Sequence, residues 1–279
     1  MCGICGKLIF SSDGDPPAPD ADLLLRMRDR LIHRGPDDAG LYLRRLGPWS
    51  VALGHRRLSI IDLSPAGRQP MSNEDGTIWV LLNGEIYNHR DLRRELEARR
   101  HRFRSRTDTE SILHLYEEVG ERCVEKLRGM FALAIWDEAQ GVLVLARDRL
   151  GQKPLVYCHR PGELLFASEA KALLEDPSIE RRVDLGALHD YLSFNYVPAP
   201  GTMFQGIRKL PPAHILLWRG GGVEVRRYWK LSPTPKLSLS EEDLTQAVLC
   251  HLEEATRLRL MSDVPLGAFL SGGIDSSAV

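Results

Sequence analysis

Residues 131–146 read FALAIWDEAQGVLVLA, which is two apolar runs joined by a polar turn with one glycine. Apolar runs of this length on either side of such a turn are typical of a β-hairpin. The pattern recurs directly afterwards, where Leu155–Cys158 and Glu163–Ala167 flank a Pro-Gly pair. We therefore expect the middle of the chain to form an antiparallel meander.

Segments before the meander add further strands and helices. Short apolar runs predict strands at Cys2–Phe10, Leu41–Leu43, Val51–Leu53, Leu58–Ile61 and Ile78–Leu82. Apolar residues at helical spacing predict helices at Leu23–Leu31 and around Leu92–Leu96. A third helix is expected to begin at Thr107, because Thr107 and Glu110 form a capping-box pattern. Strands, then helices, then hairpins indicate an α+β fold in which helices lie outside antiparallel sheets.

The composition is that of a globular chain without a dominant charge. Of 279 residues, 43% are hydrophobic and 27% charged, and 37 basic against 38 acidic residues give a net charge of -1. This balance argues against a protein that binds nucleic acid by neutralising phosphates. No uncharged apolar run approaches the ~18 residues of a membrane span, and five cysteines are an odd number for a disulfide framework. We expect a cytoplasmic protein with no nucleic-acid and no membrane partner.

The composition changes after Lys230, which predicts a domain boundary. Residues 231–239 have the proline and serine content of a linker. Ser240 is expected to cap a helix that runs to about Leu260, and Val264–Leu270 is a candidate buried strand. The prediction is a first domain at 1–230, a linker at 231–239 and, at 240–279, the first part of a second domain that is cut off.

Cys2 would become the first residue if Met1 were removed, a step that a small second residue permits. Its thiol, with an ordinary pKa of about 8.5, would then lie beside its own α-amine, with an ordinary pKa of about 7.7–8.0. One residue would thus supply a nucleophile and a general base. Two other interpretations stay open: an incidental buried cysteine, or a metal or redox pair with Cys5 that lacks a second ligand cluster.

Four more motifs follow the Cys-Gly-Ile start in order. They are His33-Arg34-Gly35-Pro36-Asp37, Arg57-Leu58-Ser59-Ile60-Ile61-Asp62, Asn83-Gly84-Glu85-Ile86-Tyr87-Asn88 and Thr107-Asp108-Thr109-Glu110. Together they resemble the glutaminase domain of the class II, N-terminal-nucleophile amidotransferases, and among these the asparagine synthetases, which also carry a Leu-Ser-Gly-Gly-x-Asp-Ser-Ser motif downstream. The resemblance spans essentially the whole chain. It implies a four-layer αββα sandwich of antiparallel sheets, followed by the start of an α/β ATP-pyrophosphatase domain.

The resemblance also implies a role for each matching residue. Cys2 is the catalytic nucleophile, and the Asn83 side-chain amide and the Gly84 backbone N–H stabilise the oxyanion. The residues expected to bind glutamine are Arg57, Leu58, Ser59, Ile60, Ile61, Asn83, Gly84, Glu85 and Asp108. Arg57 suits the substrate carboxylate because a guanidinium can pair with it through two hydrogen bonds. Glu85 and Asp108 suit its ammonium, and the His33–Pro36 segment is expected to form a wall of the site.

Each of these residues has an alternative interpretation without a substrate. Asn83-Gly84 could be a hairpin turn, although helical residues rather than a partner strand are expected after it. Asp108 falls in the first turn of a helix, where acidic residues are favoured in any case. Arg57 has a second arginine beside it, and Glu85 could be a surface charge. On residue chemistry alone these alternatives stay open.

The Ser-Gly-Gly-x-Asp-Ser segment is expected between a strand and a helix, where backbone N–H groups can bind phosphate. It lacks the Gly-Lys-Ser/Thr of a P-loop and resembles the pyrophosphate-binding loop of ATP pyrophosphatases. The resemblance implies ATP as a substrate and Mg²⁺ as a cofactor, with Asp275 helping to hold the Mg²⁺. The expected ATP and pyrophosphate contacts are Leu270, Ser271, Gly272, Gly273, Asp275 and Ser276. The alternative is a serine-glycine turn in a flexible tail.

The function implied is glutamine-dependent asparagine synthesis, in which ammonia released at Cys2 amidates adenylated aspartate and asparagine, glutamate, AMP and pyrophosphate are formed. Glutamine, aspartate and ATP would be the small-molecule partners, and a homodimer the assembly. One alternative is a similar amidotransferase with another carboxylate acceptor, whose determinants would lie beyond Val279. Phosphoribosyl and sugar-phosphate amidotransferases share the Cys2 glutaminase but use no adenylate. A regulatory module is disfavoured because Cys2 and the amide donor are both present.

Overall fold

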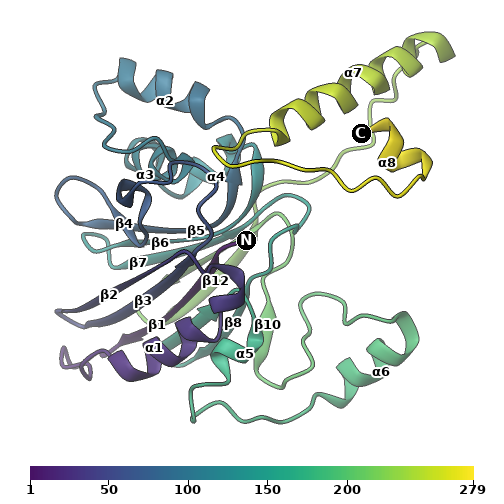
Figure 1. Cartoon of the computed structure of the whole chain (residues 1–279). Coiled ribbons are helices and arrows are strands. Elements are labelled where there is room, and N and C mark those ends of the chain that lie inside the picture. The colour runs from purple at the N-terminus through teal and green to yellow at the C-terminus, as the bar shows by residue number, and fades with distance from the viewer.

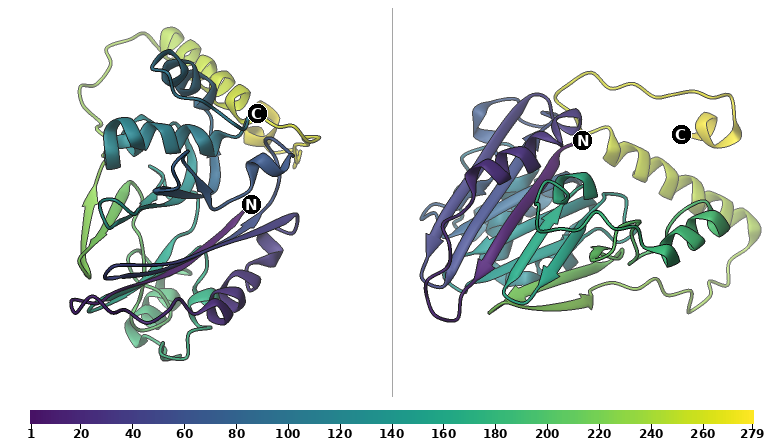
Figure 2. Two further views of the ribbon diagram at one scale, coloured as in Figure 1. Left: turned by 90° about the vertical axis from the view of Figure 1, so that its left-hand side faces the viewer. Right: turned by 90° about the horizontal axis from the view of Figure 1, so that it is seen from below.

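The computed structural model describes residues 1–279, and two antiparallel sheets of six strands each lie at its centre. In the first sheet, β1 (Gly3–Phe10) pairs with β3 (Trp49–Arg57) on one side and β9 (Glu163–Ala167) on the other. The order across this sheet is β10 (Ile207–Lys209), β8 (Val156–Arg160), β9, β1, β3 and β2 (Asp38–Leu46). Its strands run side by side in the right-hand view of Figure 2. The amino terminus therefore starts a central strand.

The second sheet contains the hairpin expected from residues 131–146. Its strands β6 (Gly129–Asp137) and β7 (Val142–Arg147) pair directly. The order is β12 (Gly222–Arg227), β11 (His214–Arg219), β7, β6, β5 (Ile78–Ile86) and β4 (Met71–Ser72). The second expected hairpin, β8 with β9, belongs to the first sheet. Both hairpins form, but they are not one meander, because the chain crosses between the sheets after β7.

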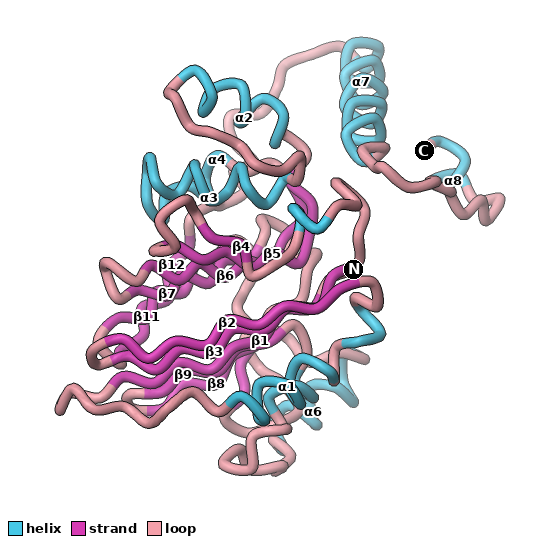
Figure 3. Tube along the Cα trace, turned by 60° about the vertical axis from the view of Figure 1, so that its left-hand side comes forward, coloured by secondary structure: helices cyan, strands magenta, loops and turns pink.

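Helices cover the outer face of each sheet, which gives four layers (Figure 3). On the first sheet lie α1 (Ala21–Asp29) and α5 (Ala170–Leu173). On the second lie α2 (His89–Ala98), α3 (Asp108–Val119) and α4 (Cys123–Lys126). An apolar core fills the space between the sheets, and in it Trp49 packs edge-on against Trp136 and Trp218 at ring-centroid distances of 5.6 and 5.3 Å. The expected αββα sandwich is confirmed.

Local sequence determines where α3 begins, which matters because Asp108 lies in its first turn. The Thr107 hydroxyl accepts a hydrogen bond from the Glu110 N–H at 3.4 Å, as the capping pattern predicts. The Glu110 carboxylate does not return to Thr107. It accepts instead from the backbone N–H groups of Arg104 and Ser105, at 2.7 and 2.8 Å. Only one of the two hydrogen bonds of a capping box is thus present, the one that the Thr107 hydroxyl accepts. The Glu110 side chain instead fixes the loop that leads into the helix.

Residues after β12 leave the sandwich. As predicted, Ser240 caps a helix, α7 (Glu241–Arg259), by accepting from the Asp243 N–H at 3.1 Å. This helix buries none of its side chains, and with α8 (Ile274–Ala278) it lies to one side of the sheets (Figure 1). Another helix, α6 (Leu185–Phe194), also projects from the body. No helix of the chain combines the length and apolarity that crossing a membrane would demand.

Three strand predictions are wrong in extent or kind. β5 does not end at Leu82 but continues to Ile86, because β6 provides partners up to Gly129. Residues 58–61 form a loop rather than a strand. The 264–270 segment has no strand partner and is mostly exposed, with Leu270 at 74%. An apolar run becomes a strand only where a neighbouring strand accepts its backbone hydrogen bonds.

Candidate active site at the amino terminus

One pocket collects most of the residues expected at the site. It lies where β1 begins and where β3 and β5 end, so both sheets contribute to its walls. From the expected set it is lined by Cys2, Arg57, Leu58, Ile60, Ile61, Gly84, Glu85 and Asp108. Ser59 and Asn83 are absent from the lining. Residues as far apart in the sequence as Cys2 and Asp108 thus share one small cavity because the sandwich brings these strand ends together.

Cys2 lies just before β1, where the backbone of Leu58 holds its thiol. Sγ accepts a hydrogen bond from the Leu58 N–H at 3.4 Å and donates to the Leu58 carbonyl at 3.7 Å. Burial raises the pKa of the Cys2 thiol, and the Leu58 contact only partly opposes this. The thiol therefore needs a base to ionise. Burial also lowers the pKa of the neighbouring amino terminus, which favours its neutral, proton-accepting form.

The Cys2 backbone is fixed from the other side by Arg34. Arg34 Nε donates to the Cys2 carbonyl at 2.9 Å, and Nη1 pairs with Glu169 Oε1 at 2.7 Å. Burial would raise the pKa of Glu169, but Arg34, Lys171 and His33 outweigh it and hold that pKa at about 2. The His33–Pro36 segment, expected as a wall of the site, does not line the pocket. It braces the nucleophile from outside.

Asn83 and Gly84 lie inside β5, opposite Ala132 and Phe131 of β6. They are therefore not a hairpin turn. The Asn83 side chain is fully buried, and neither its nitrogen nor its oxygen has a hydrogen-bond partner. It shares a strand face with Leu81, which packs between the sheets, so it points towards the layer in which Cys2 lies. A Cβ at position 84 would overlap the carbonyl oxygen of Met130, so only glycine fits there.

Arg57 ends β3 and is buried by the loop that follows. Its Nη1 donates to the Ser64 carbonyl at 3.1 Å, and its Nη2 donates to those of Ile61 and Asp62 at 3.2 and 2.5 Å. A Cβ at position 67 would overlap the guanidinium, so the glycine there leaves room for Arg57 in this position. Three carbonyls thus fix the Arg57 guanidinium at the pocket wall. An arginine on the surface would not need these partners, because water would solvate its charge.

Two carboxyl groups line the pocket. Burial raises the pKa of Asp108 to about 6, although its Oδ2 accepts from the Ile86 N–H at 2.8 Å. Burial also raises the pKa of Glu85, with Lys153 opposing. Both shifts show that burial disfavours negative charge on these two carboxyl groups, so a ligand ammonium beside them would be stabilised. With Arg57 in the same cavity, the pocket offers complementary charges to a free amino acid.

Several lining residues escape sequence analysis. Lys153 is buried in the pocket wall, and burial lowers the pKa of its ammonium. Gln69 accepts from the Leu82 N–H at 2.6 Å and donates to Thr109 Oγ1 at 3.1 Å. The remaining lining residues are Met1, Gly67, Leu82, Thr107, Thr109 and Met130. The turn-rich neighbourhood of Lys153 predicts a loop but gives no sign that the loop reaches Cys2.

Cys5 does not form a pair with Cys2. Residues three apart in a strand point to opposite faces, and Cys5 is buried under α1 and α5, where burial raises its pKa to about 12. The metal or redox interpretation of the two cysteines is therefore wrong.

The expected nucleotide loop lies away from this pocket. A turn at Gly272, where φ is +79°, leads into α8, and the hydroxyls of Ser271 and Ser276 lie 2.9 Å apart. The turn-to-helix part of the prediction is present, whereas the strand before it is not. Leu270 and the loop residues are exposed, and Asp275 is the only acid in the first turn of α8.

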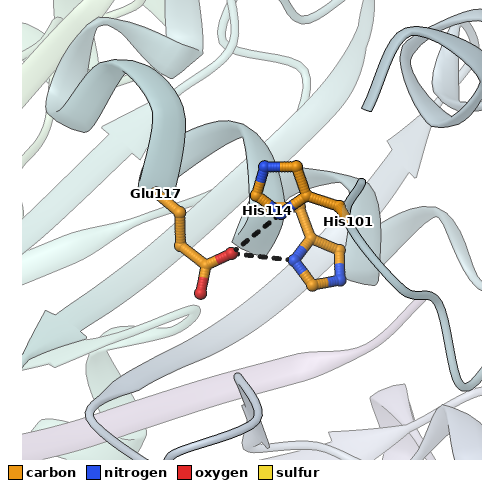
Figure 4. A group of neighbouring side chains, drawn as sticks. All are labelled: His101, His114 and Glu117. Atoms are coloured by element: carbon orange, nitrogen blue, oxygen red, sulfur yellow. Dashed lines mark hydrogen bonds and ion pairs between the residues drawn. The ribbon is translucent and has the colours of Figure 1, made fainter. Parts of the chain in front are cut away.

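A cluster of possible metal ligands, His101, His114 and Glu117, lies elsewhere on α3 and the loop before it (Figure 4). Glu117 Oε2 is 2.8 Å from His114 Nδ1 and 3.3 Å from His101 Nδ1. A tetrahedral zinc ion with bonds of about 2.0–2.2 Å would hold its donors more than about 3 Å apart. Burial opposes charge on His114, but Glu110 and Glu117 raise its pKa to about 9. The cluster is an ion-pair network that holds a proton.

This network makes a prediction for stability. A raised folded-state pKa of about 9, against an ordinary value of 6.5, stabilises the fold fully below pH 6.5 and progressively less as the pH rises through 9. Replacing His114 by Gln should flatten the fall in unfolding free energy between pH 6.5 and 9.5, measured by urea denaturation. His251→Gln, on the exposed face of α7, should keep the wild-type slope. Parallel curves for wild type and His114→Gln would contradict the assignment.

Comparison with known proteins gives two family matches. A glutamine amidotransferase domain model matches residues 1–229, and an asparagine synthase model matches residues 247–279. Among solved structures, a glutamine phosphoribosylpyrophosphate amidotransferase from B. subtilis, complexed with ADP and GMP, covers 82% of this chain and 49% of its own with a TM-score of 0.58 and 20% identity. At that identity the likeness shows the shared fold alone.

Several curated relatives match along the whole chain, and two of them illustrate the range of names. Asparagine synthetase [glutamine-hydrolyzing] 3 of Bacillus subtilis (strain 168) is 41% identical over 100% of this chain and 44% of the relative. A protein named amidase chry2, of Gibberella zeae, is 37% identical over 100% of this chain and 42% of its own length. The chain thus spans less than half the length of these two relatives. With its amino-terminal family match and its sandwich fold, the chain belongs to the glutamine amidotransferase family.

Proposed function

We propose that this chain hydrolyses glutamine at Cys2 and passes the ammonia to the synthesis of asparagine from ATP-activated aspartate. The observation that carries the first part is the position of the Cys2 thiol. It lies in a pocket that also holds one buried guanidinium and two carboxyl groups. A free amino acid with an amide side chain matches this set: its carboxylate pairs with Arg57, and its ammonium lies beside Glu85 and Asp108.

The reaction begins when the chain's amino group takes the proton of the thiol. With Met1 removed, that amine belongs to Cys2 itself, so one residue supplies both the nucleophile and the base. Sγ then attacks the amide carbon, and the carbonyl oxygen becomes an oxyanion. The amine returns its proton to the amide nitrogen as the C–N bond breaks and ammonia leaves. Water then hydrolyses the thioester to glutamate and restores the thiol.

Asn83 and Gly84 are the proposed oxyanion donors. Charge that develops on the substrate oxygen is stabilised best by donors held in place beforehand. The Asn83 amide suits this role because it is buried in β5 without a partner in the protein. A buried polar group without a partner costs stability, so its presence calls for an occupant. Glycine at position 84 keeps the backbone free of a side chain that would block approach.

The synthetase part rests on residues 240–279, which we propose as the start of a second domain joined to the glutaminase domain, 1–230, by the linker 231–239. No helix or strand lies between Arg227 and Glu241, and one family match ends at residue 229 while the other begins at residue 247. We propose that Leu270, Ser271, Gly272, Gly273, Asp275 and Ser276 bind ATP and its pyrophosphate. A single carboxylate suits Mg²⁺ only together with phosphate oxygens, which fits Asp275 beside bound ATP. Mg²⁺ would neutralise phosphate charge there.

A second candidate is amidation of another carboxylate acceptor. The match to a fungal protein named an amidase, at 37% identity over the whole chain, favours keeping it. Both candidates share the glutaminase site and differ only in the acceptor.

The test supplies glutamine alone, and then glutamine with aspartate and Mg²⁺-ATP. Release of glutamate and ammonia by the chain supports the glutaminase site, and its absence would remove the proposal. The synthetase half is tested on a protein in which this sequence continues past Val279. Asparagine and AMP should then form together. ATP-independent glutamate release with no amidation of aspartate, but amidation of another carboxylate, would support the second candidate.

A further inference from the structure

We infer that Asp263 is a positioning residue for glutamine binding. It lies in residues 240–279, here called the second segment, and it fixes the loop after β3 whose carbonyls hold the Arg57 guanidinium. This inference rests on the proposed function. Asp263 lies after α7 and is distant in sequence from the pocket, yet it makes two hydrogen bonds to the loop that follows β3. Its Oδ2 accepts from the Asp62 N–H, and its own N–H donates to the Ile60 carbonyl, each at 2.8 Å.

These two bonds clamp the loop on either side of Ile61. The carbonyls of Ile61 and Asp62 are the acceptors for Arg57 Nη2, at 3.2 and 2.5 Å. The Asp62 N–H that Asp263 holds and the Ile61 carbonyl that accepts from Arg57 belong to the same peptide group, and the Asp62 carbonyl belongs to the next one. A shift of the loop would move Arg57 directly, because the loop has no strand partner to hold it in place.

The loop conformation is one that needs such support. Asp62 has a φ of +53°, a left-handed conformation that non-glycine residues seldom adopt. Its carboxylate accepts from the N–H and hydroxyl of Ser64, at 3.1 and 2.6 Å, and from the Arg106 N–H at 2.7 Å. Those bonds tie the loop to the sandwich. The Asp62 N–H is satisfied only by Asp263, so the second segment completes the restraint.

The same segment also contacts residues that follow β5. Met261 Sδ lies 3.0 Å from His89 Nε2, and the Arg259 guanidinium lies 5.2 Å from the ring centre of Tyr87. Tyr87 and His89 follow closely on Glu85, which lines the pocket. Residues 259–263 therefore contact both the loop after β3 and the residues that follow β5. In Figure 1 the chain passes beside the sandwich just after α7 and then leads away to α8.

The test compares Asp263→Ala with Asp263→Asn in the full chain. Alanine leaves the Asp62 N–H without its acceptor, whereas the asparagine oxygen can still accept. We expect Asp263→Ala to raise KM for glutamine about tenfold and to leave kcat within about twofold, because the carboxylate contact is equal in the ground and transition states. Asp263→Asn should be near wild type. An equal rise in KM for both variants would overturn the inference.

Two further measurements separate positioning from general damage. Alkylation of Cys2 by iodoacetamide, which carries no α-carboxylate, should proceed at the wild-type rate in Asp263→Ala. The α-carboxamide analogue of glutamine lacks the carboxylate that Arg57 would bind, so wild type should bind it more weakly than glutamine. In Asp263→Ala this difference in affinity should be smaller, because Arg57 is already displaced. An unchanged ratio would count against Asp263 acting through Arg57.

A matched control is available on α7. Glu254 pairs with Arg128 at 2.7 Å and so links the same two parts of the chain, but both side chains are half exposed and neither touches the loop. Glu254→Ala should leave KM unchanged, and a rise equal to that of Asp263→Ala would show that any loosening of the segment suffices. If the wild-type protein released no glutamate, the proposed function itself would be refuted. If wild type were active and Asp263→Ala kept the wild-type KM, only the inference about Asp263 would be refuted.

Discussion

Replacing Cys2 by alanine should reduce glutamine hydrolysis to background, a loss of about 10⁶-fold in kcat if the nucleophile carries the covalent step. No other thiol can substitute. Cys5, Cys123 and Cys158 are buried and Cys250 lies on exposed α7, whereas Cys2 alone lines the pocket. The fold should persist, since Cys2 precedes β1 and its thiol contacts only the Leu58 backbone. Circular dichroism and urea denaturation should match wild type.

The matched control for this variant is Cys250→Ala, which should keep full activity. Covalent labelling gives an independent readout: a glutamine analogue with an electrophile in place of the amide should add one mass equivalent to wild type and none to Cys2→Ala. Peptide mapping should place the adduct on residue 2. A glutamyl adduct on any other side chain would remove Cys2 from the proposed mechanism.

The same experiment tests the base. Mass spectrometry of active protein should show a chain that begins at Cys2, because the proposed base is the amine of the nucleophile itself. Met1 retained on fully active protein would contradict that base. A general base loses activity when it is protonated, so kcat/KM for glutamine should fall as the pH drops through the pKa of the Cys2 α-amine, whose ordinary value is about 7.7–8.0.

Local sequence predicted those parts of the fold that local chemistry controls. Thr107 caps α3, Ser240 caps α7, and the paired apolar runs form β6–β7 and β8–β9. Sequence could not show that the two hairpins lie in different sheets, because strand pairing depends on residues far apart in the chain. Nor could it separate a strand from a loop at 58–61, where the carbonyls of Ile61 and Asp62 point to the Arg57 guanidinium.

The candidate site shows the same division. The motifs indicated Cys2, Arg57 and Asp108, and the fold brings all three to one pocket. Lys153 and Gln69 carry no motif and reach the pocket only through tertiary packing. Gln69 does so by spanning from the Leu82 N–H to Thr109. Residue types and motifs indicated which side chains to expect at the site. The other residues of the pocket wall could be found only from the three-dimensional path of the chain.

Asn83 offers the second large effect, and it separates function from stability. Replacing it by alanine should lower kcat for glutamine about 10²–10³-fold, the usual cost of losing one oxyanion donor. KM should change little, because the donor acts on charge that develops only in the transition state. Asn83→Asp should fall at least as far, since a carboxylate in place of the amide would repel the oxyanion.

Stability should move in the opposite direction from activity in Asn83→Ala. The Asn83 amide is fully buried and makes no hydrogen bond in the protein, so its removal breaks none and relieves the cost of an unsatisfied polar group. The midpoint of urea unfolding should therefore stay equal or rise while kcat collapses. Gln69→Ala is the matched comparison, because it leaves the buried Leu82 N–H without its acceptor and should lower the midpoint. If Asn83→Ala lost stability and kept kcat, the amide would be a structural group and the oxyanion would need another donor.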